Sequence, residues 1–185
     1  MNDEYDVEEE KRQGYCGVPF DSLAGEEIAS VVVKRGYGWA HDEVVFVTVP
    51  RAEDRGDVKV YTSYRMFHGQ DCCESVSLND VVGDLEDIHG VILSAEETTS
   101  EAEGKQQESA TWTFYSLRTV KGAVTLRWFG ESNGYYSEEV EFYRKRWRTR
   151  LVTEDRYETD LWTPGDDGEW SWQECDPAIA WRHNE

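Results

Sequence analysis

The sequence predicts an α+β fold that is predominantly antiparallel β, with two meanders packed as a sandwich or a partly closed barrel. Three observations lead to this fold class. Runs of β-branched and aromatic residues alternate with turn-forming segments, the single helical pattern is short, and hydrophobic residues make up 38% of the 185 residues. A chain of this length and composition can bury one core.

The first predicted meander consists of "IASVVVKR" (residues 28–35), "EVVFVTV" (43–49) and "DVKVYTSYRMF" (57–67). The segment "CCESVSL" (72–78) offers a fourth strand. One short helix is expected near residues 79–88, where Ser77, Asn79 or Asp84 can act as the N-cap and Gly83 and Gly90 interrupt the pattern. A further strand is expected at "VILSAEETTS" (91–100).

The second predicted meander begins with a hairpin around Lys121 and Gly122. A two-residue connection there pairs Leu117 with Leu126, and side-chain alternation then places one set of residues on the core face. That set is Tyr115, Leu117, Val124, Leu126 and Trp128. The run "SEEVEFYRKRWRTRLV" (137–152) is expected to add the next strand of this meander.

Changes in charge along the chain predict three regions. Residues 1–20 form an acidic, mobile segment, residues 21–143 form the β-rich domain, and residues 144–185 form an extension with a basic stripe followed by an acidic, tryptophan-rich tail. In the stripe, alternate positions from Arg144 to Arg150 are arginines that either contact phosphates or pair with carboxylates of the chain itself.

The net charge of −20, from 39 acidic and 19 basic residues, favours partners with a basic surface and opposes direct binding to nucleic acid or anionic membranes. No apolar run approaches the roughly 20 residues of a membrane span, and the N-terminus is too acidic for a signal peptide. The four cysteines have no metal or disulfide spacing, which is typical of a reducing compartment. We therefore expect a cytoplasmic protein.

One candidate ligand-binding region combines the segment from His68 to Glu74 with the loop from Ser132 to Tyr136 and the preceding Trp128. On a strand, Cys72 and Cys73 would point to opposite faces, which divides the first cluster. A ligand or metal site, a cysteine nucleophile, and a structural turn with Cys72 buried all remain open. The candidate residues are His68, Gln70, Asp71, Cys72, Glu74, Trp128, Ser132, Asn133, Tyr135 and Tyr136.

A second set of candidates comprises acidic residues that could contact a basic partner, with a simple solvated acidic face as the alternative. These residues are Asp84, Glu86, Asp87, Glu96 and Glu97. The sequence contains no EF-hand spacing, phosphate-binding glycine loop or GxSxG motif, so it predicts no particular reaction and identifies no cofactor or metal.

Several separated motifs together resemble an uncharacterised domain family of bacteriophage and prophage proteins. The matching segments are "HGQDCCE" from His68, "GDL" from Gly83, "AEE" from Ala95, "TWTFY" from Thr111, "RWFG" from Arg127 and "SNGYYSE" from Ser132. The resemblance covers about residues 21–143. It implies a phage setting and a compact β-rich domain, and it carries no established reaction.

The leading functional expectation is a non-enzymatic phage accessory protein that binds a host factor, as a counter-defence inhibitor or a mimic of nucleic acid. The alternative is a domain that binds a small ligand, such as a nucleotide, or a metal. In that alternative the turn from His68 to Glu74 and the loop from Ser132 to Glu138 form the pocket. A hydrolytic role requires the same groups to converge within hydrogen-bonding distance.

Overall fold

The computed structural model describes residues 13–36, 41–53, 57–70, 72–102, 109–153, 156–165 and 169–175. Residues 1–12 of the predicted mobile segment, Asp71, and residues 176–185 of the predicted extension lie outside the described residues. The elements are β1 (Tyr15–Gly17), η1 (Phe20–Leu23), β2 (Glu27–Lys34), β3 (Glu43–Thr48), β4 (Arg51–Glu53), β5 (Val58–Phe67), β6 (Glu74–Val82), η3 (Leu85–Ile88), β7 (Gly90–Val91), β8 (Ser94–Glu101), β9 (Ser109–Arg118), β10 (Ala123–Ser132), β11 (Glu141–Thr153), β12 (Arg156–Pro164) and β13 (Trp170–Glu174).

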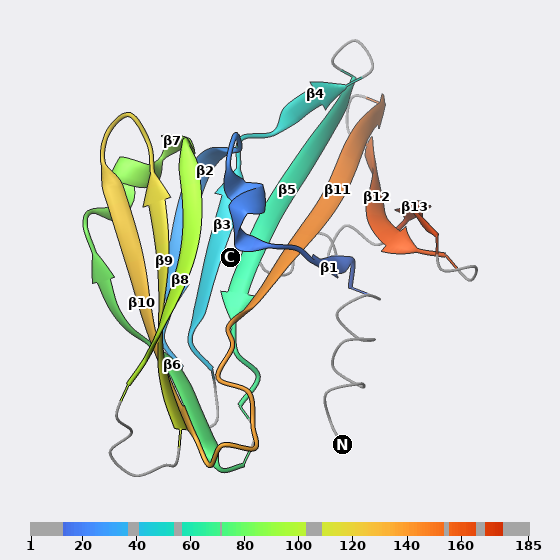
Figure 1. The fold of residues 1–185 in the computed structure, drawn as a ribbon. Coiled ribbons are helices and arrows are strands. Elements are labelled where there is room, and N and C mark those ends of the chain that lie inside the picture. The colour runs from blue at the N-terminus through green and yellow to red at the C-terminus, as the bar shows by residue number, and fades with distance from the viewer. Residues whose placement is uncertain are drawn as a thin grey trace. The chain divides into compact units, whose positions relative to one another are not determined.

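The described strands form two sheets (Figure 1). The larger sheet has the order β13-β12-β11-β5-β3-β2-β7, with β1 paired to β11 and β4 to β5, and the smaller sheet has the order β6-β10-β9-β8. The predominantly antiparallel β architecture is confirmed. The barrel alternative is wrong, because the strand pairing of the described residues closes neither sheet. The sandwich stays a prediction.

The chain divides into two compact units. One unit contains residues 18–46 and 65–142 and includes the whole smaller sheet together with β2 and β7. The other consists of the described residues within 13–17, 47–64 and 143–175 and includes β1, β4, β12 and β13. Strands β3, β5 and β11 each contribute residues to both units.

The predicted first meander is confirmed by the neighbouring strands β2, β3 and β5. The predicted helix near residues 79–88 is only partly correct. Strand β6 continues to Val82, and the helical segment is the single 3-10 turn η3, where the Asp84 side chain accepts a hydrogen bond from the Glu86 backbone N–H. The β-branched Val81 and Val82 extend the strand, and Gly83, with φ +106°, ends it.

The hairpin of β9 and β10 has the predicted core face but a different register. Leu117 is paired with Val124 and Tyr115 with Leu126, whereas counting from a two-residue turn pairs Leu117 with Leu126. The connection contains four residues, from Thr119 to Gly122, and the Thr119 N–H bonds to the Gly122 carbonyl across it. Because the shift is two residues, every side chain keeps its predicted face.

The prediction that residues 137–152 extend the second meander is wrong. Strand β10 is flanked by β9 and β6, and β6 is the strand predicted to join the first meander. The segment after β10 instead becomes β11, which belongs to the larger sheet. Alternating side chains identify a strand but not its neighbour, since the same apolar face can pack in either sheet.

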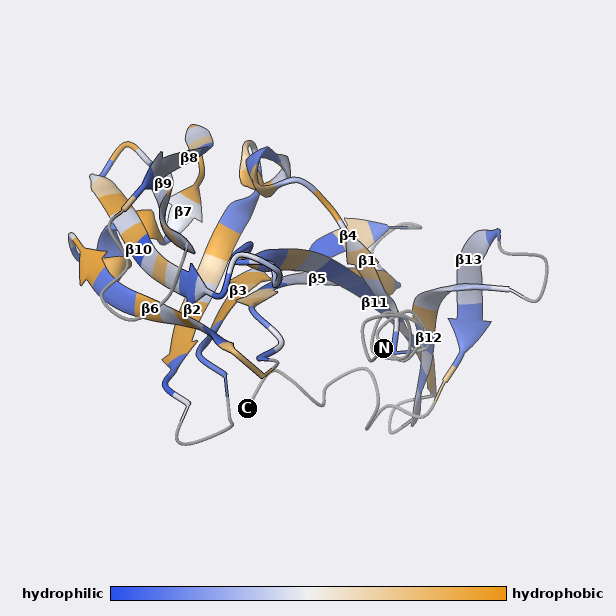
Figure 2. Cartoon of the chain, turned by 60° about the horizontal axis from the view of Figure 1, so that its bottom comes forward, coloured by the Kyte–Doolittle hydropathy of each residue, from blue (hydrophilic) through white to orange (hydrophobic). Residues whose placement is uncertain are grey.

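The inward face of the smaller sheet changes from apolar to polar along its strands. On β9, the buried Leu117 and Tyr115 are followed on the same face by Thr113, Thr111 and Ser109. The alternation of hydrophobic and hydrophilic residues is visible along β6 and β10 (Figure 2). The apolar end of this face therefore supplies core, and the polar end can line a solvent-filled space.

The second unit has its own small core around Trp147, which is fully buried and stacks on Tyr61 with ring centroids 5.5 Å apart. One arginine of the basic stripe pairs with a carboxylate of the chain, as one of the two interpretations of the stripe expected. Arg148 bonds to Asp160 at 2.7 Å, and its guanidinium lies 4.8 Å from the Trp172 ring centroid.

Candidate functional site

The two segments of the predicted ligand-binding region lie side by side at one end of the smaller sheet. Pairing of β6 with β10 places Glu74 opposite Ser132. Beyond this pair, the Asn133 N–H donates to the Cys73 carbonyl at 3.2 Å, and the Cys72 Sγ lies 3.3 Å from the Tyr136 hydroxyl. The structure therefore joins the segments that sequence reasoning had linked.

His68 and Glu74 form a buried pair at this junction. The His68 Nε2 lies 2.9 Å from the Glu74 Oε1, and the side chains are only 6% and 3% exposed. The other ring nitrogen lies 2.6 Å from the Glu139 carbonyl. Because a carbonyl and a carboxylate both accept, this arrangement requires a proton on both ring nitrogens or on Glu74 itself. The pair links the segment after β5, the first residue of β6 and the segment before β11.

Gln70 also has a structural role at this junction, since its side chain bonds to the backbone of Val76. Its side-chain amide donates to the Val76 carbonyl, and its oxygen accepts from the Val76 N–H at 3.3 Å. The amide thus takes the place of a neighbouring strand at this position. Gln70 and His68 therefore both hold the start of β6 in place.

The cysteines do not have the predicted strand geometry. Cys72 and Cys73 lie in the turn before β6, and Cys73 has a left-handed φ of 69°. Both are exposed, so the interpretation of Cys72 as a small buried core residue is wrong. Strand β6 begins two residues later than the predicted segment, and for this reason the alternation argument did not apply to these two residues.

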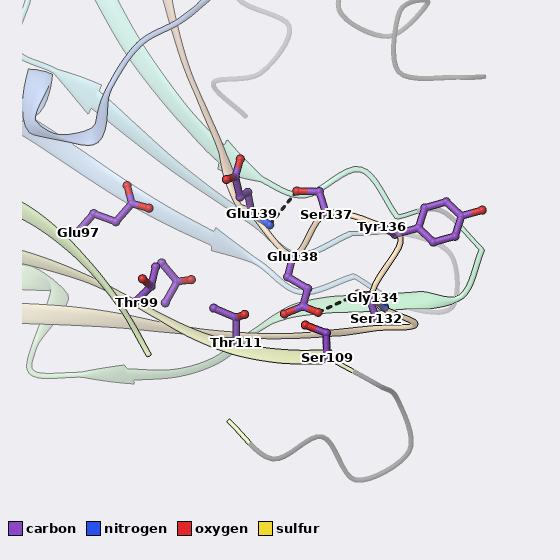
Figure 3. Close-up of a pocket in the computed structure, with 11 residues that line it drawn as sticks. Glu97, Thr99, Ser109, Thr111, Ser132, Gly134, Tyr136, Ser137, Glu138 and Glu139 are labelled. Carbon is purple, nitrogen blue, oxygen red and sulfur yellow. Dashed lines mark hydrogen bonds between the residues drawn. The ribbon is translucent and has the colours of Figure 1, made fainter. Parts of the chain in front are cut away.

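A hollow of about 430 Å³ adjoins this junction (Figure 3). Its walls come from the polar ends of β8, β9 and β10 and from the loop after β10, and they consist of hydroxyls, carboxylates and one glycine. The lining residues are Glu97, Thr99, Ser109, Thr111, Thr113, Ser132, Gly134, Tyr136, Ser137, Glu138 and Glu139. No lysine or arginine is among them.

Glu138 lies in the segment after β10 and packs against Gly130 on the inward face of that strand. A Cβ atom added to Gly130 would lie 2.8 Å from the Glu138 Cβ. Glycine is therefore needed at this position for the segment containing Glu138 to approach β10. The Ser132 hydroxyl donates to the Glu138 Oε1 at 2.8 Å (Figure 3). The Glu138 Oε2 is buried and, within the described residues, has no hydrogen-bond partner. One oxygen of this carboxylate thus has unused accepting capacity.

Glu97 on β8 contributes a second carboxylate to the hollow. It accepts a hydrogen bond from the Tyr115 hydroxyl at 3.3 Å. Burial, together with the charge of Glu97, raises the pKa of Tyr115. Tyr115 therefore stays protonated and serves as a fixed donor that orients Glu97.

The predicted candidates divide between the hollow, its supporting turn and the core. Ser132, Tyr136 and Glu97 line the hollow, whereas Trp128 is buried in the core. Asn133 and Tyr135 are exposed, and the Asn133 side chain accepts from the Tyr135 N–H at 3.1 Å. His68, Gln70, Cys72 and Glu74 are not lining residues.

The acidic residues predicted to bind a partner come from two segments, η3 with its flanking residues and strand β8. Asp84 caps η3, and Glu86 pairs with His89 at 3.0 Å in the same segment. The Asp87 carbonyl accepts from the Thr119 hydroxyl near the β9–β10 turn. Glu96 and Glu97 lie on β8 and, as neighbours on a strand, point to opposite faces.

Sequence reasoning missed the lining residues on β8 and β9 other than Glu97, including Thr111 and Ser109, and it placed Ser137 and Glu138 in the predicted pocket loop without naming them as candidate residues. The threonines and Ser109 looked like ordinary strand residues. The available signal was the order of residues on one face of β9, where Leu117 and Tyr115 are followed by Thr113 and Thr111. An apolar strand face that becomes polar indicates a boundary of the core.

A separate charged cluster surrounds His41, which is half-buried. The buried Arg65 pairs with Glu43, and its Nη2 lies 3.2 Å from the His41 Nε2. Because a guanidinium only donates, that ring nitrogen must accept, which requires neutral histidine. Burial lowers the pKa of His41 below its ordinary value of 6.5, and the charge of Arg65 lowers this pKa further. Glu43 and Asp42 raise the pKa by smaller amounts, and His68 lowers it.

Lowering the pH should therefore weaken the fold through His41. The folded pKa lies below the unfolded one, so below about pH 6.5 the unfolded chain binds more protons and the free energy of unfolding falls. Urea denaturation between about pH 7 and 5 should show a shallower decline for His41→Gln than for the parent chain. Identical slopes would contradict a depressed His41 pKa.

Within the described residues, no group of three or more His, Cys, Asp or Glu side chains is arranged to hold a metal ion. No helix in that part of the chain is both long and apolar enough to cross a membrane.

Comparison with known proteins identifies one family. The model of the domain of unknown function DUF7448 matches residues 23–142, which is more than half of the chain and close to the extent of the resemblance noted above. Neither the curated proteins nor the solved structures contain a match. The chain therefore belongs to the DUF7448 family.

Proposed function

We propose that this chain is a non-enzymatic binding protein that recognises a cationic surface of a protein partner, with the hollow beside β10 receiving an arginine or lysine side chain. The observation that carries the proposal is the Glu138 carboxylate, whose Oε2 is buried and has no partner within the described residues. Glu97 and Glu139 lie in the same lining, which includes no basic side chain.

The energetics favour a cationic occupant. A buried acceptor left without a hydrogen bond costs about 1–3 kcal/mol, and an incoming N–H donor can recover that loss. A guanidinium offers several donors in one plane, so it can bond to a carboxylate and to nearby hydroxyls together. The net charge of −20 would add long-range attraction for a basic partner.

The biological setting is also part of the proposal. The resemblance of the motifs to phage and prophage proteins supports an accessory protein acting in the host cytoplasm. A strongly acidic chain can occupy a basic groove that normally holds nucleic acid, so a defence or nucleic-acid-handling factor of the host is the proposed partner.

A small ligand in the same hollow is the second candidate function. The volume of about 430 Å³ lies within the range of ligand pockets. Carboxylates in the lining oppose a nucleotide phosphate and favour an amine or a guanidino compound instead. The His68–Glu74 pair adds no hydrolytic site to this proposal, because both side chains are buried against each other and neither lines the hollow.

A matched pair of variants tests the proposed binding mode. Fluorescence anisotropy with an arginine-rich peptide should give at least about tenfold weaker binding for Glu97→Gln/Glu138→Gln, because a charge-assisted hydrogen bond contributes about 1.5–3 kcal/mol. Glu86→Gln/Glu96→Gln removes the same charge from exposed positions outside the lining and should change the Kd by less than about fivefold. Binding should also weaken as salt is added.

Equal weakening by the two double variants would indicate only diffuse attraction to the net charge and would overturn the hollow as the binding site. No binding of the parent chain at low salt would overturn the proposed function itself.

A further inference from the structure

The turn before β6 contains two adjacent thiols in contact. The Cys72 and Cys73 Sγ atoms are 3.7 Å apart, and both residues are exposed. Cys73 has φ 69°, a conformation that L-residues other than asparagine and aspartate rarely adopt. The turn is held to the neighbouring loop through the Cys73 carbonyl and the Cys72 Sγ. Two accessible sulfur atoms are thereby kept within reach of each other.

We propose that Cys72 and Cys73 form a site of reversible oxidation, which a small-molecule disulfide such as oxidised glutathione converts into a disulfide between the adjacent residues. One cysteine thiolate attacks the glutathione disulfide, forming a mixed disulfide and releasing one glutathione thiolate. The neighbouring thiolate then attacks the cysteine sulfur of that mixed disulfide and releases the second glutathione. The two thiols lose two electrons and two protons, and one glutathione disulfide becomes two glutathione thiols.

The short distance between the Cα atoms of adjacent residues makes this disulfide easy to reduce. Adjacent Cα atoms are about 3.8 Å apart, whereas disulfides usually span roughly 4.4–6.8 Å. A strained disulfide has a more oxidising potential and is readily opened by thiols, which is typical of labile rather than structural bonds. The site is therefore suited to switching and not to stabilising the fold.

The oxidised turn would also affect the hollow. In the reduced chain the Cys72 Sγ lies 3.3 Å from the hydroxyl of Tyr136, which lines the hollow. Forming the S–S bond shortens the 3.7 Å separation of the Cys72 and Cys73 sulfurs, and movement of the Cys72 sulfur would change its contact with Tyr136. The inference itself rests on the geometry of the turn and stands whether or not the hollow binds a cation.

Mass spectrometry of the folded full-length chain tests the site. After incubation with oxidised glutathione and alkylation of the remaining thiols, the parent chain should lose two alkylatable thiols without retaining glutathione, and peptide mapping should place the bond at Cys72 and Cys73. A reductant should restore both thiols. Cys73→Ser should instead retain one glutathione on Cys72, because the resolving thiol is absent.

The control variant Cys16→Ser/Cys175→Ser keeps the turn and should be oxidised like the parent chain. The proposal is overturned if Cys72 and Cys73 both stay alkylatable, or if each retains its own glutathione. Oxidation mapped to Cys16 or Cys175 in the parent chain, with the adjacent pair unchanged, overturns it equally.

Discussion

Replacing Trp128 with alanine should lower the free energy of unfolding by about 3–5 kcal/mol. The side chain is 1% exposed and shares the inward face of β10 with the buried Leu126 and Val124. Its removal loses a large apolar surface and leaves a cavity that rigid strands cannot fill. Urea denaturation followed by circular dichroism measures the loss. Trp128→Phe should be milder, because the buried indole N–H has no hydrogen-bond partner within the described residues.

Trp112 on β9 provides the matched control. It is only partly buried, and it packs on Phe129 with ring centroids 4.7 Å apart and lies near the Arg127 guanidinium. Trp112→Ala should cost only about 1 kcal/mol, the scale of an aromatic pair at a partly exposed position. Equal losses for Trp128→Ala and Trp112→Ala would contradict the assignment of inward and outward faces.

Alanine at His68 should be similarly destabilising, by about 3–5 kcal/mol, because it removes the imidazole that lies against the buried Glu74 carboxylate. Glu74→Ala should have a similar effect, since it leaves the His68 ring buried beside a carbonyl alone. The double variant should lose less than the sum of the two single losses, because each single variant already removes the interaction between the two side chains. A double-mutant cycle of denaturation curves gives this coupling free energy directly.

The exposed pair of Glu86 and His89 is the control for this cycle. Its atoms are 3.0 Å apart, almost as in the buried pair, but the side chains are 78% and 27% exposed. Coupling there should be below about 1 kcal/mol. Coupling of equal size in both pairs would mean that burial does not strengthen the interaction of His68 with Glu74.

The sequence was sufficient to predict which side chains face inward but not how strands are ordered. Side-chain alternation has period two, so a register shift of two residues leaves Tyr115 and Trp128 on the predicted inward face. The register depends on the length of the β9–β10 turn. Lys121-Gly122 suggested a two-residue turn, whereas the connection contains four residues. Whether residues after β10 join the smaller or the larger sheet depends on distant partners, and local pattern contains no such information.

The candidate site was likewise predicted only in part. The approach of the segment at His68 to the loop at Ser132 was expected, and pairing of Glu74 with Ser132 brings them together. Glu138 was predicted only as the last residue of the pocket loop and not as a binding residue, because one carboxylate among 39 acidic residues has no distinguishing sequence context. The structure shows that the segment after β10 folds back against Gly130 and that the Glu138 Oε2 is buried there.

The most direct test of the proposed cationic site is an NMR titration of the isotope-labelled full-length chain with a capped tripeptide that has arginine at its centre. The amide shifts of Thr99, Thr111, Ser137 and Glu139 should change together and saturate, because all four residues line the hollow. The amides of Asp84 and Glu86, which are acidic but outside the lining, should change little. Shift changes spread evenly over acidic residues, or larger at Asp84 and Glu86 than in the hollow, would contradict the account.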